Sequence, residues 1–251
     1  MKCGRKAIMW IALVLCLVCA VLLDLALHSR AEHAKPASKD PEGAIAAQED
    51  EDRTVDVPVD FAAWQERNPD VYAWIEYPGT NVDYPIVQSA EDDAYYLRRD
   101  IDGKEAVAGS LYTEHTYNSK TFDDPVTVIY GHNMANRTMF GGLQSHIEAA
   151  DLASTEEYFY VYLPGRILTY RVVGGAPGDD AHILYYNDFS DPTGFSNYFG
   201  NLYAQSGGHV NLPGLLRPSP DDRVVILATC MNGEKYLRYL IIGVLTDDTA
   251  D

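Results

Sequence analysis

The sequence contains few cysteines, and most of them lie close together. Of the four, Cys3, Cys16 and Cys19 lie in or beside an apolar N-terminal segment, so the rest of the chain has a single thiol at Cys230. A lone thiol cannot form an internal disulfide, and no Cys/His spacing typical of a zinc site occurs. The sequence therefore argues against a disulfide scaffold and predicts no metal site.

Basic residues are also scarce. The chain has 19 Lys and Arg against 37 Asp and Glu, which gives a formal net charge of −18. Nucleic acid is a poor partner for so acidic a surface, because the phosphate backbone needs positive charge to bind. No internal repeat occurs, and the acidic surface is most simply explained by solubility.

The N-terminal segment predicts a membrane anchor. Residues 7–23 carry no charge, and after Asp24 the apolar pattern resumes, so we expect a transmembrane signal-anchor helix over 7–28. Three basic residues lie among the first six, which predicts a single-pass membrane protein with a cytoplasmic N-terminus (1–6) and an extracellular domain after the anchor. A cleaved signal peptide is the alternative, although no clear small-x-small cleavage site follows the apolar core.

Residues 29–56 predict a flexible acidic stalk. They are rich in charge, alanine and proline and nearly lack large apolar side chains, so they cannot bury enough surface to offset their chain entropy. The remaining residues, 57–251, are enough for one well-buried domain.

The pattern of this domain is mainly β. Asp60 predicts the N-cap of a short helix that ends near Asn68, and helices are also expected over 139–146 and 194–206. The predicted strands are rich in Val, Ile and Tyr and bounded by turn residues: 71–77, 82–87, 109–113, 126–130, 158–163, 167–174, 224–229 and 239–246. Eight short strands favour a barrel or a sandwich.

Three residues point to nucleophilic chemistry. Cys230 ends an apolar run, and a turn between two antiparallel strands would bring Arg238 back beside it. His132 follows Gly131 at the end of another predicted strand, where a side chain can project into a cleft. A cysteine nucleophile needs such a base or cation, and acyl transfer needs donors for the oxyanion. From these residues alone, a structural His132 and a simply exposed Arg238 stay open.

Several ordered motifs resemble one family, the class B sortases, which are cysteine transpeptidases of Gram-positive cell surfaces. The signature Thr-Leu-x-Thr-Cys is matched by 226–230, with Ile226 in place of its first Thr and Ala228 in place of the Ser common in class B. The resemblance continues over 68–75, 79–88, 95–97, 108–112 and 128–134, and the helix at 194–206 is similar to the extra helix of this class. It covers nearly the whole exported domain.

The resemblance implies an eight-stranded sortase-type barrel with an N-terminal helix and an extra helix before the cysteine strand. It implies Cys230 as nucleophile, His132 as general acid and base, and Arg238 as the group that stabilises the oxyanion, with no cofactor. By position, the groove that binds the sorting peptide would be lined by Asp93, Leu97, Leu184, Tyr185, Ala228 and Thr229.

The implied partners are secreted proteins with a C-terminal sorting motif, cleaved after Thr, and an amine from a peptidoglycan precursor or a pilin lysine. A cysteine hydrolase of surface peptides is the first alternative, because hydrolysis passes through the same thioester. A non-enzymatic surface protein is the second, although residues 245–251 carry neither a sorting motif nor a basic tail.

Overall fold

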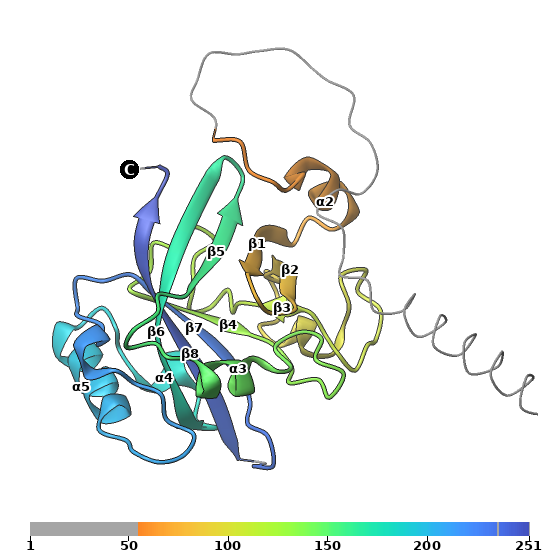
Figure 1. The fold of residues 1–251 in the computed structure, drawn as a ribbon. Helices are drawn as coiled ribbons and strands as arrows, with labels where there is room; N and C mark the ends of the chain where they lie inside the picture. Colours follow the sequence, from red (N-terminus) through yellow and green to blue (C-terminus); the bar gives the residue numbers. More distant parts are fainter. Residues whose placement is uncertain (1–54, 235, 251) are drawn as a thin grey trace, which may run out of the picture. The chain divides into compact units, whose positions relative to one another are not determined.

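A computed structural model describes residues 55–234 and 236–250, and within them eight strands close into a barrel (Figure 1). The order around the barrel is β1-β2-β3-β4-β7-β8-β6-β5, which confirms the predicted eight-stranded fold. The strands are β1 (Val71–Tyr77), β2 (Val82–Val87), β3 (Leu111–Tyr112), β4 (Val126–Tyr130), β5 (Tyr158–Leu163), β6 (Arg166–Asp179), β7 (Val224–Cys230) and β8 (Leu237–Asp248). The helices are α2 (Phe61–Arg67), α3 (Leu143–Ala149), α4 (Ile183–Tyr186) and α5 (Pro192–Tyr203), with 3-10 turns η1 (Tyr95–Arg98) and η2 (Gly214–Leu216).

The barrel is mixed rather than purely antiparallel. β2 pairs with β3, and β4 pairs with β7, in parallel, whereas the other neighbouring strands pair antiparallel. β4 and β7 therefore end at the same rim of the barrel, and the residues that follow them meet there.

The cysteine strand is apolar throughout because both of its faces are buried. Val225 and Leu227 belong to the cluster that fills the barrel, whereas Val224, Ile226 and Ala228 belong to a second cluster with the buried residues of α5. Side chains alternate between the faces of a strand, so a strand that is covered on both sides reads as a continuous apolar run. This packing fixes the direction in which the end of β7 points.

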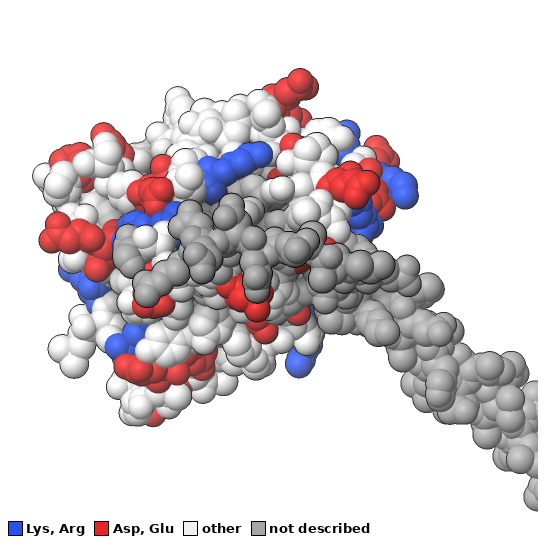
Figure 2. All heavy atoms as spheres, turned by 90° about the horizontal axis from the view of Figure 1, so that it is seen from above, with Lys and Arg blue, Asp and Glu red and all other residues white. Residues whose placement is uncertain are grey.

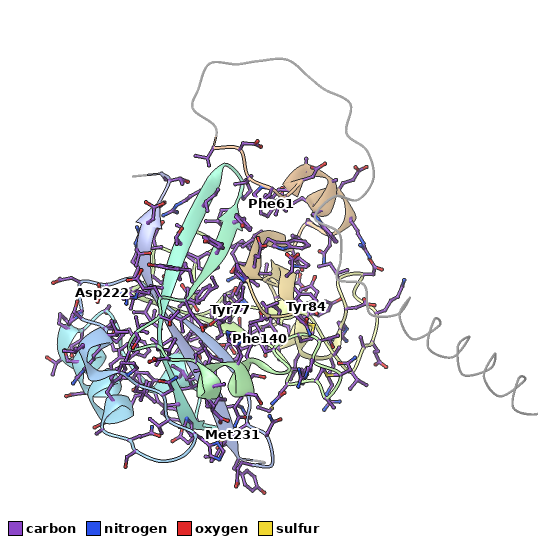
Figure 3. The ribbon with its side chains drawn as sticks, in the orientation of Figure 1. Phe61, Tyr77, Tyr84, Phe140, Asp222 and Met231 are labelled. Atoms are coloured by element: carbon purple, nitrogen blue, oxygen red, sulfur yellow. The ribbon has the colours of Figure 1, made fainter. Side chains whose placement is uncertain are left out.

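Two helices begin at an aspartate cap, and one of these caps, Asp60, was predicted. The Asp60 carboxylate accepts a hydrogen bond from Ala63 N at 3.0 Å and so caps α2, which packs Trp64 against Trp74 of β1 with 5.3 Å between ring centroids. Asp191 caps α5 by accepting from Thr193 N and Gly194 N, with Pro192 in the first turn. Figure 3 places Phe61 of α2 at one end of the barrel and Met231, the residue after Cys230, at the other.

Several bounds differ from the predictions: the helix expected at 194–206 is α5 at 192–203, the strand expected at 109–113 is β3 at 111–112, and β8 extends beyond 239–246 at both ends. Two further differences have a clear physical cause. The expected helix at 139–146 begins only at Leu143, because Met139 has a positive φ of 54° and bridges to Asn133. β6 extends past Gly174 to Asp179 because β8 pairs with it along this whole length. Gly175 is needed there, since a Cβ at this position would lie 2.6 Å from Ile147 of α3.

The predicted cytoplasmic N-terminus, the signal-anchor helix and almost all of the predicted stalk lie in residues 1–54, outside the described residues. Within the described part of the chain, none of the helices has the length and apolar character needed to cross a bilayer. Figure 2 shows acidic and basic side chains interspersed over the described part of one face.

Candidate active site

The candidate site lies at the rim of the barrel where β4 and β7 end and β8 begins. Tyr130 of β4 is opposite Ala228 of β7 in the register, and Cys230 of β7 is opposite Arg238 of β8. Directly paired residues project to the same face, and so do residues two apart in a strand. His132, two residues after Tyr130, is therefore placed on the same side as Cys230 and Arg238.

Cys230 is an exposed, free thiol at the end of β7. Its backbone carbonyl accepts a hydrogen bond from Asn133 Nδ2 at 2.8 Å, and the same amide group donates to Asn232 Oδ1 at 2.9 Å. Asn133 thus ties the residues after β4 to the residues after β7. The strand positions the thiol from one side, and Asn133 fixes the backbone from the other.

Arg238 faces the site without a carboxylate partner among the described residues. Within the described chain, its one hydrogen bond runs from Nη1 to the Leu237 carbonyl, at a long 3.3 Å. The guanidinium is permanently charged and keeps most of its N–H donors available. This arrangement suits the binding of a carbonyl oxygen or an oxyanion.

The His132 ring is oriented by a backbone carbonyl. Its Nε2 lies 2.8 Å from the carbonyl oxygen of Leu97, a residue of η1. A carbonyl can only accept, so Nε2 carries the hydrogen and the lone pair of the neutral ring lies on Nδ1. His132 therefore has one nitrogen fixed by the protein and one that can take up a proton.

These three residues line one pocket of about 250 Å³. Its wall combines apolar and polar groups: Leu97, Ser110, Tyr112, Glu114, Tyr130, Gly131, His132, Asp180, Ala181, His182, Ile183, Ala228, Thr229, Cys230 and Arg238. Burial, together with the nearby negative charge of Glu114, raises the pKa of both Tyr112 and Tyr130, so these phenols stay neutral hydroxyls. The pocket therefore offers neutral hydroxyls, one guanidinium and one thiol close together.

Three of the predicted groove residues belong to this pocket. Leu97, Ala228 and Thr229 line it, and the structure thereby brings them together with Cys230, His132 and Arg238. Ala228 contributes no hydrogen-bonding side chain, whereas the Thr229 Oγ1 is buried with no hydrogen-bond partner among the described atoms.

The structure places the other three predicted groove residues outside the pocket. Leu184 and Tyr185 lie on α4 and line a separate depression of about 490 Å³ with residues 186–190. Asp93 accepts from Thr116 N at 3.2 Å and lies 2.6 Å from His115 Nδ1. Burial opposes ionisation of Asp93, but the Thr116 hydrogen bonds and the His115 charge lower its pKa overall. These bonds hold the loop beside the pocket.

Sequence reasoning missed several residues of the wall. The only sequence feature that points to Asn133 is its position next to His132. The only one that points to Tyr130 is the alternation of side chains along the strand, which places it two residues before His132. Glu114 and His182 are 68 residues apart in the chain, and no local pattern links them. Among the described residues, no group of three or more His, Cys, Asp or Glu side chains is arranged to hold a metal ion.

Comparison with known proteins agrees with this architecture. Among solved structures, the barrel is similar to sortase B from Listeria monocytogenes, with 28% identity and a TM-score of 0.59 over 74% of this chain and 99% of that chain. It is also similar to sortase B from Clostridium perfringens, with 24% identity and a TM-score of 0.62 over 74% and 100%. The class defined by the fold and by the cysteine at this rim is thus the sortase-type barrel.

The sequence relatives narrow the class. The chain is 30% identical to sortase B of Listeria monocytogenes over 174 residues, which are 68% of this chain and 67% of that protein. It is 27% identical to sortase B of Staphylococcus aureus over 88 residues, which are 35% of each. No family model matches the sequence. The chain belongs to the sortase B family, a family of cysteine transpeptidases.

Proposed function

We propose that this protein is a membrane-anchored transpeptidase that cleaves a C-terminal sorting motif after Thr and joins the acyl group to an amine at the cell surface. The observation that carries this proposal is the exposed Cys230 opposite Arg238, which pairs with no carboxylate of residues 55–234 and 236–250, with His132 on the adjoining strand end. A nucleophile, a proton carrier and a fixed cation in one pocket are the parts that acyl transfer requires.

The first stage forms a thioester. The Cys230 sulfur, as thiolate, attacks the carbonyl carbon of the Thr residue, and the developing oxyanion accepts hydrogen bonds from Arg238. The tetrahedral intermediate collapses, the carbon–nitrogen bond breaks, and His132 as imidazolium gives its proton to the departing amine. The N-terminal part of the sorted protein is then bound to Cys230.

The second stage transfers the acyl group. An incoming amine attacks the thioester carbon while His132 takes up a proton from the amine, and the Cys230 thiolate leaves. The scheme uses only these side chains and requires no metal ion or organic cofactor. The amine comes from a peptidoglycan precursor or from a pilin lysine, and either supplies the primary amine that this step needs.

The peptide groove is proposed to pass Leu97, Ala228 and Thr229, which line the pocket beside the thiol. A solved structure of a Staphylococcus aureus sortase B–substrate complex has the same fold, with a TM-score of 0.62 at 18% identity over 74% of this chain. Ala228 has no hydroxyl to offer a peptide, and the Thr229 Oγ1 is buried on the face of β7 that fills the barrel. Asp93, Leu184 and Tyr185 are proposed to contact the motif farther from the thiol.

The test is a screen of the full-length protein against a panel of sorting peptides, with and without an added primary amine, read by mass spectrometry. Transfer predicts cleavage after Thr and an amide product when amine is present. A hydrolase would give the free acid alone at every amine concentration. Cys230→Ala is the control, and full activity in this variant would overturn the proposal.

A further inference from the structure

One wall of the pocket is a short segment with little intrinsic stability. Asp180, Ala181, His182 and Ile183 line the pocket, and α4 continues from Ile183 for only 4 residues. A single helical turn is not stable by itself in water, because helix nucleation fixes several residues for one hydrogen bond. The shape of this wall therefore depends on whatever holds the segment in place.

His182 makes two side-chain contacts in opposite directions. Tyr185 N donates a hydrogen bond to Nδ1 at 3.1 Å, which caps the start of α4. A backbone N–H can only donate, so Nδ1 is the acceptor and the hydrogen of the neutral ring lies on Nε2. That Nε2 lies 3.1 Å from Oε1 and 3.0 Å from Oε2 of Glu114, and it donates to this carboxylate.

Glu114 is the anchored member of the pair. Its side chain is 12% exposed against 34% for His182, and its backbone carbonyl accepts from Asn118 N at 2.9 Å. The Asn118 side chain in turn bonds Val126 and Val128 of β4. The carboxylate is thus connected to the wall of the barrel, whereas His182 lies on the segment that has to be held.

The surroundings favour a fixed pair. Burial raises the pKa of Glu114, and the facing His182 opposes that shift. Tyr117 packs its ring 4.8 Å from the His182 ring. The other titratable or charged groups around the pair are Asp93, Tyr112, Tyr130, Asp180, Tyr185 and Arg238. Within the described residues, Glu114 is the one carboxylate that pairs with His182.

We propose that the Glu114–His182 pair is a positioning clamp, which holds α4 and residues 180–183 against the rim of the barrel and so shapes the pocket for the acyl donor. This inference rests on the proposed function, because it assigns a role in binding the sorting peptide. Neither residue reacts with substrate. They act through Ala181 and Ile183, which form the wall.

The test compares His182→Ala, His182→Asn, Glu114→Ala and the Glu114→Ala/His182→Ala double variant. His182→Ala and Glu114→Ala are expected to raise KM for the sorting peptide about three- to tenfold, the size of one net hydrogen bond, while kcat changes by less than about twofold. The double variant should lose no more than the worse single variant, because both remove one interaction.

Amide hydrogen exchange at Tyr185 gives a readout independent of turnover. His182→Ala should speed this exchange, whereas His182→Asn should keep it slow, because Asn also caps helices but is too short to reach Glu114. His182→Asn should therefore share the KM increase without the loss of the cap. The matched control is His209→Ala, which removes another surface His–Glu pair, with Glu148 at 2.7 Å, outside the pocket. It should change neither KM nor exchange at Tyr185.

Unchanged KM and unchanged Tyr185 exchange in His182→Ala would overturn the clamp, and so would additive losses in the double variant. If the wild-type protein turns over no peptide at all, the proposed function fails. In that case the exchange comparison still decides whether the pair holds α4.

Discussion

The β7–β8 pair carries an arginine at each end, and the two ends are built differently. Where β7 begins and β8 ends, the Asp248 side chain is only 2% exposed and pairs with two arginines. Its Oδ2 lies 2.8 Å from Arg223 Nη2 and 2.6 Å from Arg166 Nη2. Where β7 ends and β8 begins, Arg238 faces Cys230 with no carboxylate partner in the described chain. One end uses guanidinium groups to close the barrel, and the other leaves one available for a ligand.

Charge pairing at the closed end also changes titration. The Arg166 hydrogen bond is the largest cause that lowers the pKa of Asp248, and Arg223 adds to it. Arginine is therefore structural where carboxylates pair with it and is proposed to be functional at Arg238, where no described carboxylate does. The positive charge of an arginine does not distinguish a structural from a functional role, but the presence or absence of a carboxylate partner does.

The largest expected effect is on activity, and it should be seen at only one end of the β7–β8 pair. Arg238→Ala should lower kcat/KM for peptide cleavage about 100- to 1000-fold, the loss typical of removing one oxyanion donor, and should leave the fold intact. Steady-state kinetics and circular dichroism check this. Arg223→Ala is the matched control, because it should lower stability while each folded molecule keeps its turnover. Equal losses of kcat/KM in both variants would contradict the different roles given to Arg238 and Arg223.

The next effect is on stability at the closed end. Arg166→Ala should lower the free energy of unfolding by about 2 kcal/mol, because it leaves the buried Asp248 carboxylate short of a charged donor. Urea unfolding at neutral pH measures this. Arg238→Ala should change the same quantity by less than about 0.5 kcal/mol. A stability loss in Arg238→Ala that matches Arg166→Ala would contradict the account.

Stability should also depend on pH at the closed end. Because the folded-state pKa of Asp248 is lowered, its carboxylate stabilises the fold above the unfolded pKa, and this contribution is lost as the pH falls below about 5. Unfolding free energies measured from pH 7 down to pH 3 should fall less steeply in Asp248→Asn than in the wild type. Parallel curves would show that the group does not couple to folding.

The smallest effect concerns Thr127 and Thr229, two buried threonines whose Oγ1 atoms have no hydrogen-bond partner among the described atoms. Both side chains lie on the face of β4 and β7 that fills the barrel, the face opposite to Cys230. Thr127→Val and Thr229→Val should therefore both leave KM for the peptide unchanged within about twofold. Peptide kinetics of the two variants check this, and a rise in KM confined to Thr229→Val would contradict this placement.

The sequence predicted the barrel well because strands buried on two faces have a strong pattern. The bounds of β1, β2, β4 and β5 agree with the predictions, since turn residues flank each apolar run. The glycine-rich half of β6 was missed because its conformation depends on pairing with β8, which a local pattern does not contain. The start of α3 was also mispredicted, because a local pattern does not contain the positive φ of Met139.

For the site, the sequence singled out Cys230, His132 and Arg238 because each lies at the end of a predicted strand. The pocket wall could not be assembled in this way. Glu114 meets His182, and Asn133 meets Cys230, only through closure of the barrel. Leu184 and Tyr185, which were assigned to the groove by position, line a separate depression, and their contact with the peptide stays a prediction.

The central claim is that Cys230 carries the acyl group as a thioester. The most direct test is the intact mass of the protein after brief incubation with a cleavable sorting peptide and no added amine. We predict a mass increase equal to the acyl fragment, absent in Cys230→Ala and released by hydroxylamine. Peptide cleavage without any such adduct, or an adduct that persists in Cys230→Ala, would contradict the account.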